Sequence, residues 1–161
     1  MPNPVDIIKE DHRKVEGLFA DFKGCDKADH DTRRDIANQI IKELAVHAKM
    51  EEKYFYPDLK EAMGDDKAKP VEDAIAEHHA ARVLLMELKL MPVDADQFDS
   101  RMHVLEETIM HHVEEEESKL LPFAEETINA DEMERVGKEM AEYKEGLYAT
   151  VLDKLLGDGS N

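Results

Sequence analysis

The sequence predicts an all-α protein: an up-and-down antiparallel four-helix bundle with an additional C-terminal helix. Glycine and proline are sparse, at 7 and 6 of 161 residues, whereas residues that favour helix are plentiful. Apolar residues recur at steps of three and four in five segments. The pattern of the first two segments returns in the next two, which predicts a repeated two-helix unit. We expect one domain over residues 1–161, with the bundle at about 3–125 and the last helix at about 130–156.

The first two helices carry polar residues inside their apolar stripes. Asn3 and Pro4 suit the cap and first turn of the first helix, which ends near Gly24. Its stripe is Val5, Ile8, His12, Val15, Phe19 and Phe22. Thr32 or Asp31 is expected to cap the second helix, and Pro57 to interrupt it. Its stripe is Ile36, Ile40, Leu44, His47, Glu51 and then Tyr54 or Phe55.

The third and fourth helices repeat this arrangement. The third is expected to start near Pro70 and to break at residues 91–94, and Pro122 follows the fourth. The stripe of the third is Val71, Ala74 or Ile75, His78, Ala81, Leu85 and Leu88. That of the fourth is Phe98, Met102, Leu105, Ile109, His112 and Glu116. The fifth segment has an apolar stripe without such residues, which predicts a helix that covers the bundle or mediates dimerisation.

One motif occurs twice. Residues 47–57 read H-A-K-M-E-E-K-Y-F-Y-P and residues 112–122 read H-V-E-E-E-E-S-K-L-L-P, so both fit H-x3-E-E-x4-P. An acid–histidine pair precedes each copy, Asp11–His12 and Glu77–His78. Residues four apart on a helix share a face, so each copy directs an imidazole and a carboxylate at one point.

These residues predict a metal site with six ligands: His12, His47, Glu51, His78, His112 and Glu116. An ionised glutamate is almost never buried unless it is paired or bound to a metal. Two metals would each receive two histidine nitrogens and, if both glutamates bridge, two carboxylate oxygens. Iron would keep positions for an oxo or hydroxo bridge and for an exogenous ligand. Such a mixed set suits Fe, Mn or Zn better than Ca or Mg.

Other polar residues near these stripes have less certain roles. His79 and His111 each lie one position from a stripe and are expected at the surface or behind the ligands. Glu16 and Arg82 hold equivalent places in the two repeats and predict a salt bridge across the bundle, or, for Glu16, an extra ligand. Tyr54 and Tyr56 are expected to pack between helices, with a hydrogen bond to a bound oxygen species as the alternative. The acidic run 114–117 is expected to face solvent except at Glu116.

The inward surface around the metals is expected to be apolar and to admit only small ligands. Its predicted members are Ile8, Val15, Ile40, Leu44, Leu85 and Ile109.

Charge and composition exclude several classes of partner. The formal net charge of −18 disfavours nucleic acid and anionic membrane surfaces, which both attract Lys and Arg. No stretch approaches the roughly 18 consecutive apolar residues of a membrane helix. The single cysteine, Cys25, fits a reducing compartment, and no signal peptide is visible. We therefore expect a cytoplasmic protein.

The motifs resemble those of the hemerythrin-like family, the HHE cation-binding domains. The matching pieces are D-H-R-K-V, H-A-K-M-E-E-K-Y-F-Y-P, E-H-H-A-A-R-V-L-L and H-V-E-E-E-E-S-K-L-L-P, over roughly residues 3–125. Oxygen carriers of this family have a fifth histidine in a His-x3-His pair on the third helix. Here Ala74 and Arg82 stand four residues on either side of His78. The set of four histidines and two glutamates resembles a bacterial subclass and implies ligand sensing or chemistry at the metal rather than simple O₂ carriage.

The resemblance implies a non-haem di-iron protein that binds O₂, NO or peroxide, for sensing, binding or stress protection. One alternative is an enzyme that decomposes H₂O₂ or NO, and another is a bundle whose metal is purely structural. The implied cofactor is two Fe ions, with Zn or Mn as the alternatives. Whether the chain is an enzyme, and whether it forms a homodimer or needs a separate output partner, stays open at this point.

Overall fold

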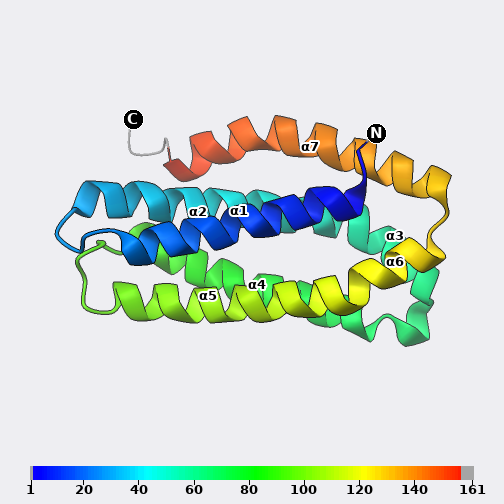
Figure 1. Cartoon of the computed structure of the whole chain (residues 1–161), viewed down its shortest axis with the longest axis horizontal. Coiled ribbons are helices and arrows are strands. Elements are labelled where there is room, and N and C mark those ends of the chain that lie inside the picture. The colour runs from blue at the N-terminus through cyan, green and yellow to red at the C-terminus, as the bar shows by residue number, and fades with distance from the viewer. Residues whose placement is uncertain (1, 157–161) are drawn as a thin grey trace.

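The predicted all-α fold is confirmed. The computed structural model describes residues 2–156, with side chains described through residue 146, and every regular element in that range is a helix. Four long helices run antiparallel along the bundle, and α7 lies lengthwise against α2 and α1 (Figure 1). The four bundle helices are α1 (Pro4–Gly24), α2 (His30–Met50), α4 (Lys69–Leu90) and α5 (Phe98–Glu115), and α7 spans Ala130–Leu156. Shorter segments are η1 (Glu51–Phe55), α3 (Tyr56–Met63), η2 (Asp65–Lys67), η3 (Glu116–Leu120) and α6 (Leu121–Thr127).

Helices α1 and α2 begin at capping residues, and that of α2 was not predicted. The Asn3 side chain accepts a hydrogen bond from the Val5 N–H at 2.8 Å, as expected for the start of α1. The second helix starts earlier than predicted, because Asp29, rather than Thr32 or Asp31, is its cap and accepts from the Thr32 N–H at 3.2 Å. Asp29 provides a carboxylate that can reach this free N–H from outside the helix.

Contrary to the predictions, Pro57 does not interrupt the second helix, and the helical path of the fourth does not end before Pro122. The chain stays helical through both prolines, and a π-helical turn, η1 or η3, precedes each of them. In these turns the Tyr56 N–H donates to the Glu51 carbonyl, and the Leu121 N–H donates to that of Glu116, five residues back. Proline lacks an N–H, and its ring crowds the carbonyl four residues earlier, so a wider turn relieves the contact.

The core consists of two apolar clusters with polar residues between them. One cluster fills the end of the bundle near the α1–α2 and α4–α5 connections and includes Phe19, Phe22 and Phe98. The other fills the opposite end and includes Phe55 and Tyr56. The predicted ligands fall between the two along each helix, so the candidate site lies in the middle of the bundle.

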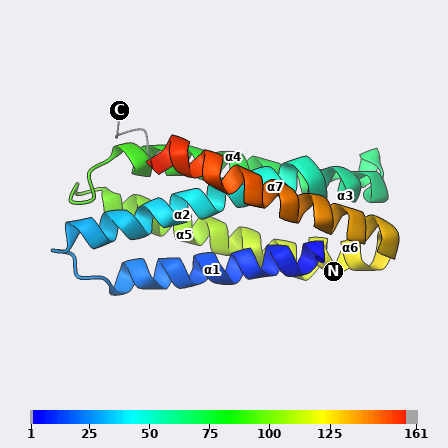
Figure 2. The same cartoon turned by 90° about the horizontal axis from the view of Figure 1, so that it is seen from above.

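Helix α7 docks closely against the N-terminal segment at a glycine. A Cβ atom at Gly137 would lie 2.8 Å from the carbonyl carbon of Pro2, closer than real Cβ contacts allow. Seen from above, α7 runs at a slant over the other helices (Figure 2). The absence of a side chain at Gly137 therefore permits this crossing.

Two alanine substitutions in α7 should change stability in opposite directions. Glycine costs a helix interior roughly 1 kcal/mol relative to alanine, and no atom lies within 4 Å of a Cβ at Gly146, so G146A should stabilise the chain. At Gly137 the new methyl meets backbone, and overpacking of about 1–3 kcal/mol outweighs the gain. Chemical denaturation followed by circular dichroism measures both, and equal stabilisation by the two substitutions would contradict the close contact.

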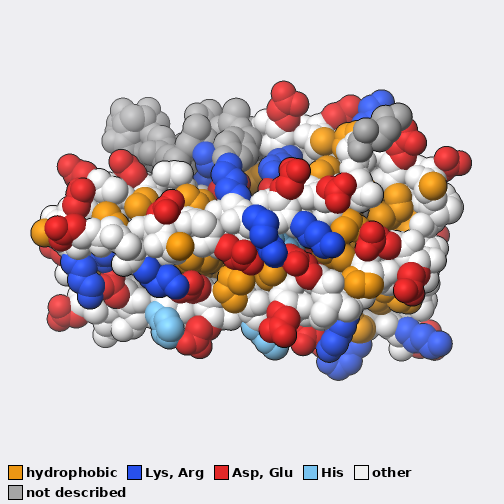
Figure 3. Space-filling model, viewed as in Figure 1, with side chains coloured by type: hydrophobic (Ala, Val, Ile, Leu, Met, Phe, Trp, Pro, Cys, Tyr) orange, Lys and Arg blue, Asp and Glu red, His pale blue; other side chains and the backbone are white. Residues whose placement is uncertain are grey.

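The visible surface mixes charges of both signs. Acidic and basic side chains alternate over the face shown in Figure 3. Across the described residues, no helix has both the length and the apolar character needed to cross a membrane.

Candidate metal centre

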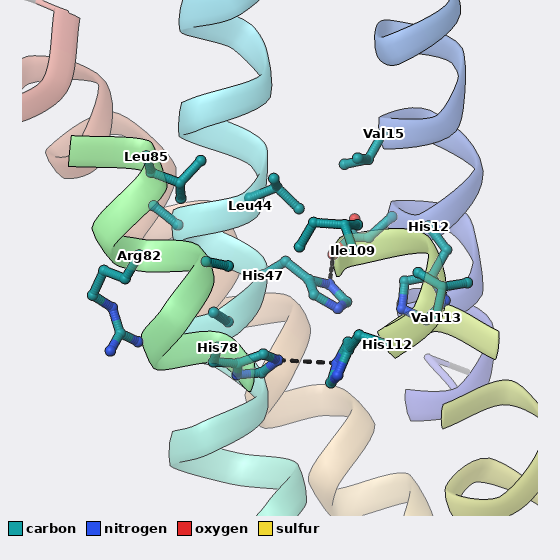
Figure 4. A pocket seen from close by; sticks show the side chains of 14 residues that line it. His12, Val15, Leu44, His47, His78, Arg82, Leu85, Ile109, His112 and Val113 are labelled. Carbon is teal, nitrogen blue, oxygen red and sulfur yellow. Dashed lines mark hydrogen bonds and ion pairs between the residues drawn. The ribbon is translucent and has the colours of Figure 1, made fainter. Parts of the chain in front are cut away.

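The structure brings all six predicted residues together in the centre of the bundle. Their side chains are at most 7% exposed although all are polar. The histidines come from four different helices, and their rings point toward one another (Figure 4). The two glutamates are the first residues of the π turns, with side chains 0% exposed. Two helices thus contribute one histidine each, and the other two contribute a His–Glu pair, to the same point in the bundle.

The first half of the cluster contains His12, His47, Glu51 and Glu116, whose candidate ligand atoms all lie within 4.8 Å of one another. His12 Nε2 lies 3.1 Å from a Glu116 oxygen, and His47 Nε2 lies 3.0 Å from a Glu51 oxygen. Yet both of these nitrogens, Glu51 Oε2 and Glu116 Oε1 are buried without a hydrogen-bond partner. Buried polar atoms are nearly always paired, so four such atoms around one point fit a bound cation.

The second half contains His78, His112 and again Glu51. His78 Nε2 lies 3.2 Å from Glu51 Oε1 and 3.1 Å from His112 Nε2, and His112 Nε2 lies 3.7 Å from Glu116 Oε2. Each half therefore takes its two histidines from one repeat, while the glutamates of both repeats lie between the halves. The residues fit two cations held by histidine nitrogen and shared carboxylate oxygen.

Each histidine is held at its other ring nitrogen by a carboxylate. Asp11 bonds His47 Nδ1 at 2.8 Å and Glu77 bonds His112 Nδ1 at 2.9 Å, both within one repeat. Glu117 bonds His12 Nδ1 at 2.6 Å and Glu52 bonds His78 Nδ1 at 3.0 Å, both between repeats. A carboxylate at Nδ1 fixes the tautomer that leaves Nε2 free for a metal, and it orients the ring.

These four carboxylates have basic side chains behind them, from different parts of the fold. Arg13 bonds Glu117, and Arg82 bonds Glu52 at 3.0 Å. Lys144 of α7 bonds Asp11, and His111 lies 3.9 Å from Glu77. The pairing of acid with base limits the cost of placing four carboxylates around a buried site.

Burial and close charges shift several pKa values in the metal-free cluster. Burial by itself would lower the pKa of His78, but hydrogen bonds to the Glu51 and Glu52 carboxylates outweigh it and raise this pKa to about 9. Burial acts the same way on His47, whose pKa is nevertheless raised well above its usual value by the charge of Glu51 and by Asp11. Burial would raise the pKa of Glu51, but the two histidines hold it well below its usual range. His47 and His78 therefore hold a proton more strongly than a free histidine does.

Tyr56 belongs to the site, although the sequence favoured a role in helix packing for it. Its side chain is buried, and its hydroxyl donates to Glu116 Oε2 at 2.6 Å and lies 3.3 Å from Glu51 Oε1. Burial, with the charges of Glu116 and Glu51 adding to it, raises the pKa of Tyr56 well above its usual value, so the phenol keeps its proton. A residue five positions after Glu51 would point about 140° away on an α-helix, but the π turn brings it onto the same face.

Other predictions about polar neighbours are corrected. Glu16 and Arg82 do not form the expected pair: Glu16 lies 3.3 Å from Arg13, while Arg82 bonds Glu52. Glu16 is also outside both groups of candidate ligands found among the described residues. Glu117 does not simply face solvent, since it holds His12. His79 and His111 are exposed, as expected from their positions beside the stripes.

A small cavity adjoins the cluster. Its volume is about 40 Å³, and it lies among α1, α2, α4 and α5 with the four histidines along one side. Four predicted inward residues line it, whereas Ile8 and Ile40 are buried in the core but do not line the cavity. The four are Val15, Leu44, Leu85 and Ile109. A water molecule occupies about 30 Å³ in the liquid, so only ligands of a few atoms fit without movement of the walls.

Comparison with known proteins agrees with this geometry. The family model of the hemerythrin HHE cation-binding domain matches residues 3–124. A crystal structure of a hemerythrin HHE cation-binding domain-containing protein from Mycobacterium kansasii is similar over 99% of this chain and 95% of that one, with a TM-score of 0.84 and 26% identity.

Two of the curated relatives are longer than this chain. An uncharacterized hemerythrin-like protein of Schizosaccharomyces pombe is 29% identical over 127 residues, and a DNA nickase of Nostoc is 27% identical over 157 residues. The aligned region covers 62% of the first and 43% of the second, so the chain spans about half the length of these two relatives. From the family match over most of its length and from the His/Glu cluster at the centre of its bundle, the chain belongs to the hemerythrin HHE cation-binding family.

Proposed function

We propose that the chain holds two iron ions through His12, His47, Glu51, His78, His112 and Glu116, and that it binds a small ligand such as O₂, NO or peroxide beside them. The observation that carries this proposal is the set of four buried, unpartnered atoms on His12, His47, Glu51 and Glu116. Histidine nitrogen with carboxylate oxygen suits iron, and Mn and Zn are the competing ions. Bound iron would supply redox chemistry and open coordination positions.

The protein's own residues support a role with small, weakly polar ligands. The cavity beside the histidines is narrow and largely apolar, which favours uncharged molecules of a few atoms. The Nδ1 carboxylates hold the rings in place, and Tyr56 offers a protonated hydroxyl next to Glu116. This hydroxyl specifically favours the second candidate function, decomposition of peroxide or NO, because such a reaction needs proton donors inside the site.

Metal analysis combined with optical spectroscopy tests the proposal. The purified chain, loaded with iron, should contain two irons and show absorption bands that change on addition of O₂, NO or H₂O₂. His78→Ala and His112→Ala should each lower the iron content. Exposed histidines on the same two helices provide matched controls, because His79→Ala and His103→Ala should leave it at two. A single unreactive zinc ion would support a structural metal instead, and equal losses in all four variants would refute the assigned ligands.

Metal loading should release protons at neutral pH. Histidine must be neutral to bind a metal, and His78 of the metal-free site keeps a proton up to about pH 9. The apparent affinity for Zn²⁺ should therefore keep rising as the pH is raised from 6.5 to about 9. A weakly buffered titration with a pH indicator measures the protons released. Zn²⁺ binding without proton release at pH 7.5 would contradict the raised pKa.

The stability of the metal-free chain should change with pH in the opposite sense. A pKa raised from 6.5 to about 9 in the folded state stabilises the fold fully below pH 6.5, and this contribution is lost as the pH rises through 9. Thermal unfolding in the presence of a chelator should show it. A melting temperature that climbs from pH 7 to 9.5 would count against the protonated histidine.

A further inference from the structure

Helix α7 contacts the metal centre from outside the region that defines the family. The family model ends at residue 124, whereas α7 spans Ala130–Leu156. Even so, the Lys144 ammonium bonds Asp11, a carboxylate whose side chain is 3% exposed. Asp11 in turn bonds His47 Nδ1 at 2.8 Å. A chain of two contacts therefore joins α7 to a candidate ligand.

The same turn of α7 also touches the π turn that carries Glu51. The Tyr143 ring meets the Tyr54 ring edge-on, with centroids 5.0 Å apart. The Lys53 ammonium lies 4.7 Å from the centre of the Tyr143 ring. Adjacent residues of α7 thus support the two groups next to the first half of the cluster: the carboxylate behind His47 and the turn that begins with Glu51.

The other histidine-holding carboxylates do not depend on α7 in this way. Arg13 of α1 supports Glu117, and Arg82 of α4 supports Glu52. Among the described residues, the contact behind Glu77 is with His111 of α5. Displacement of α7 would therefore leave the carboxylates behind His78 and His112 with their partners, but it would remove the ammonium from Asp11.

We propose that Lys144 is a positioning residue through which α7 controls retention of the metal ion bound by His12 and His47. With its ammonium in place, Asp11 stays fixed and holds the His47 ring toward the cluster. Without the ammonium, the buried Asp11 carboxylate lacks the positive charge that Lys144 supplies, and the His47 ring is less restrained. The two ions are therefore unequal: a movement of α7 releases one of them and spares the other. This inference rests on the proposed two-metal site.

Release of Co²⁺ from the whole chain tests the inference, because Co²⁺ reports both its departure and its coordination in the visible spectrum. Lys144→Met removes the charge and keeps most of the side-chain length. In this variant one of the two ions should transfer to a chelator about 10-fold faster than in the unmodified chain, the lower end of the effect of losing a partner directly behind a ligand, because Lys144 acts through Asp11. The other ion should leave at its original rate. Lys144→Arg should restore the slow rate, and Lys138→Met, an exposed lysine on the same helix, should not change it.

A double-substitution cycle separates positioning from a general loss of structure. Asp11→Asn removes the negative charge that Lys144 contacts, so adding Lys144→Met to it should accelerate release little further. Acceleration of both ions together, or additive effects in the double variant, would overturn the inference. If the unmodified chain binds two ions and Lys144→Met releases them unchanged, only the role of Lys144 fails. If the unmodified chain binds fewer than two, the proposed site fails and the inference falls with it.

Discussion

Glu51→Gln is expected to weaken the binding of both metal ions, whereas Glu116→Gln should act mainly on one. Glu51 is the one residue shared by the two groups of candidate ligands in the described part of the chain. Its Oε1 lies 3.0 Å from His47 Nε2 and 3.2 Å from His78 Nε2. The amide keeps the shape of the side chain but loses its charge. Loss of a group behind a ligand typically lowers metal affinity by about 10- to 100-fold, so loss of the ligand itself should lower it by more than about 100-fold.

Metal content and thermal unfolding together measure this effect. Bound metal stabilises the folded state in proportion to the logarithm of its concentration above the dissociation constant. The unmodified chain should therefore melt higher with added Zn²⁺, and the Glu51→Gln variant should not. Glu114→Gln, an exposed member of the acidic run, is the matched control and should behave like the unmodified chain. A Glu51→Gln variant that retains two ions of undiminished affinity would rule out a bridging role.

Tyr56→Phe is expected to separate metal binding from reactivity. The phenyl ring keeps the contact with the His78 ring, whose centre is 5.5 Å away, so both metals should be retained. The lost hydroxyl is the donor to Glu116 Oε2 at 2.6 Å. A positioned proton donor typically contributes 10²–10⁴-fold to a rate, so peroxide decomposition by the iron-loaded chain should fall by about 100-fold.

Tyr54→Phe is the control for this substitution. The Tyr54 ring packs against Tyr143, away from the carboxylates, so removal of its hydroxyl should leave peroxide decomposition unchanged. Oxygen evolution after addition of H₂O₂ follows the rate, and iron analysis of the same samples follows the occupancy. A similar loss in both variants, or loss of iron from Tyr56→Phe, would argue against a proton-donating role for Tyr56.

The sequence alone was sufficient for the bundle and for the convergence of the six residues. Both follow from one periodicity: polar residues in otherwise apolar stripes must meet wherever the stripes meet. The repeated motif also contained the carboxylates behind the histidines. Asp11 and Glu77 precede a histidine in each repeat, and Glu52 and Glu117 are the second acids of the two E-E pairs. The structure then shows which histidine Nδ1 each of these acids bonds.

Features that break the α-helical period could not be predicted in the same way. Tyr56 reaches the glutamates only because the helix widens to a π turn before Pro57, which changes the direction of every side chain after it. The contact between Lys144 and Asp11 depends on how α7 docks, and no local pattern encodes that crossing. The prediction for the stripe of α7 at Leu147, Val151 and Leu155 falls on side chains outside the described residues.

The exchange of carboxylates between the two repeats bears on how such a protein can arise. Glu52 of the first repeat holds His78 of the second, and Glu117 of the second holds His12 of the first. A single helical hairpin with one copy of the motif therefore has its histidines and one glutamate but lacks the acid that orients its leading histidine. Two identical hairpins related by a twofold axis would supply that acid to each other. The present chain has the arrangement of such a symmetric dimer within a single chain, with a tyrosine before the proline in the first copy and a leucine in the second.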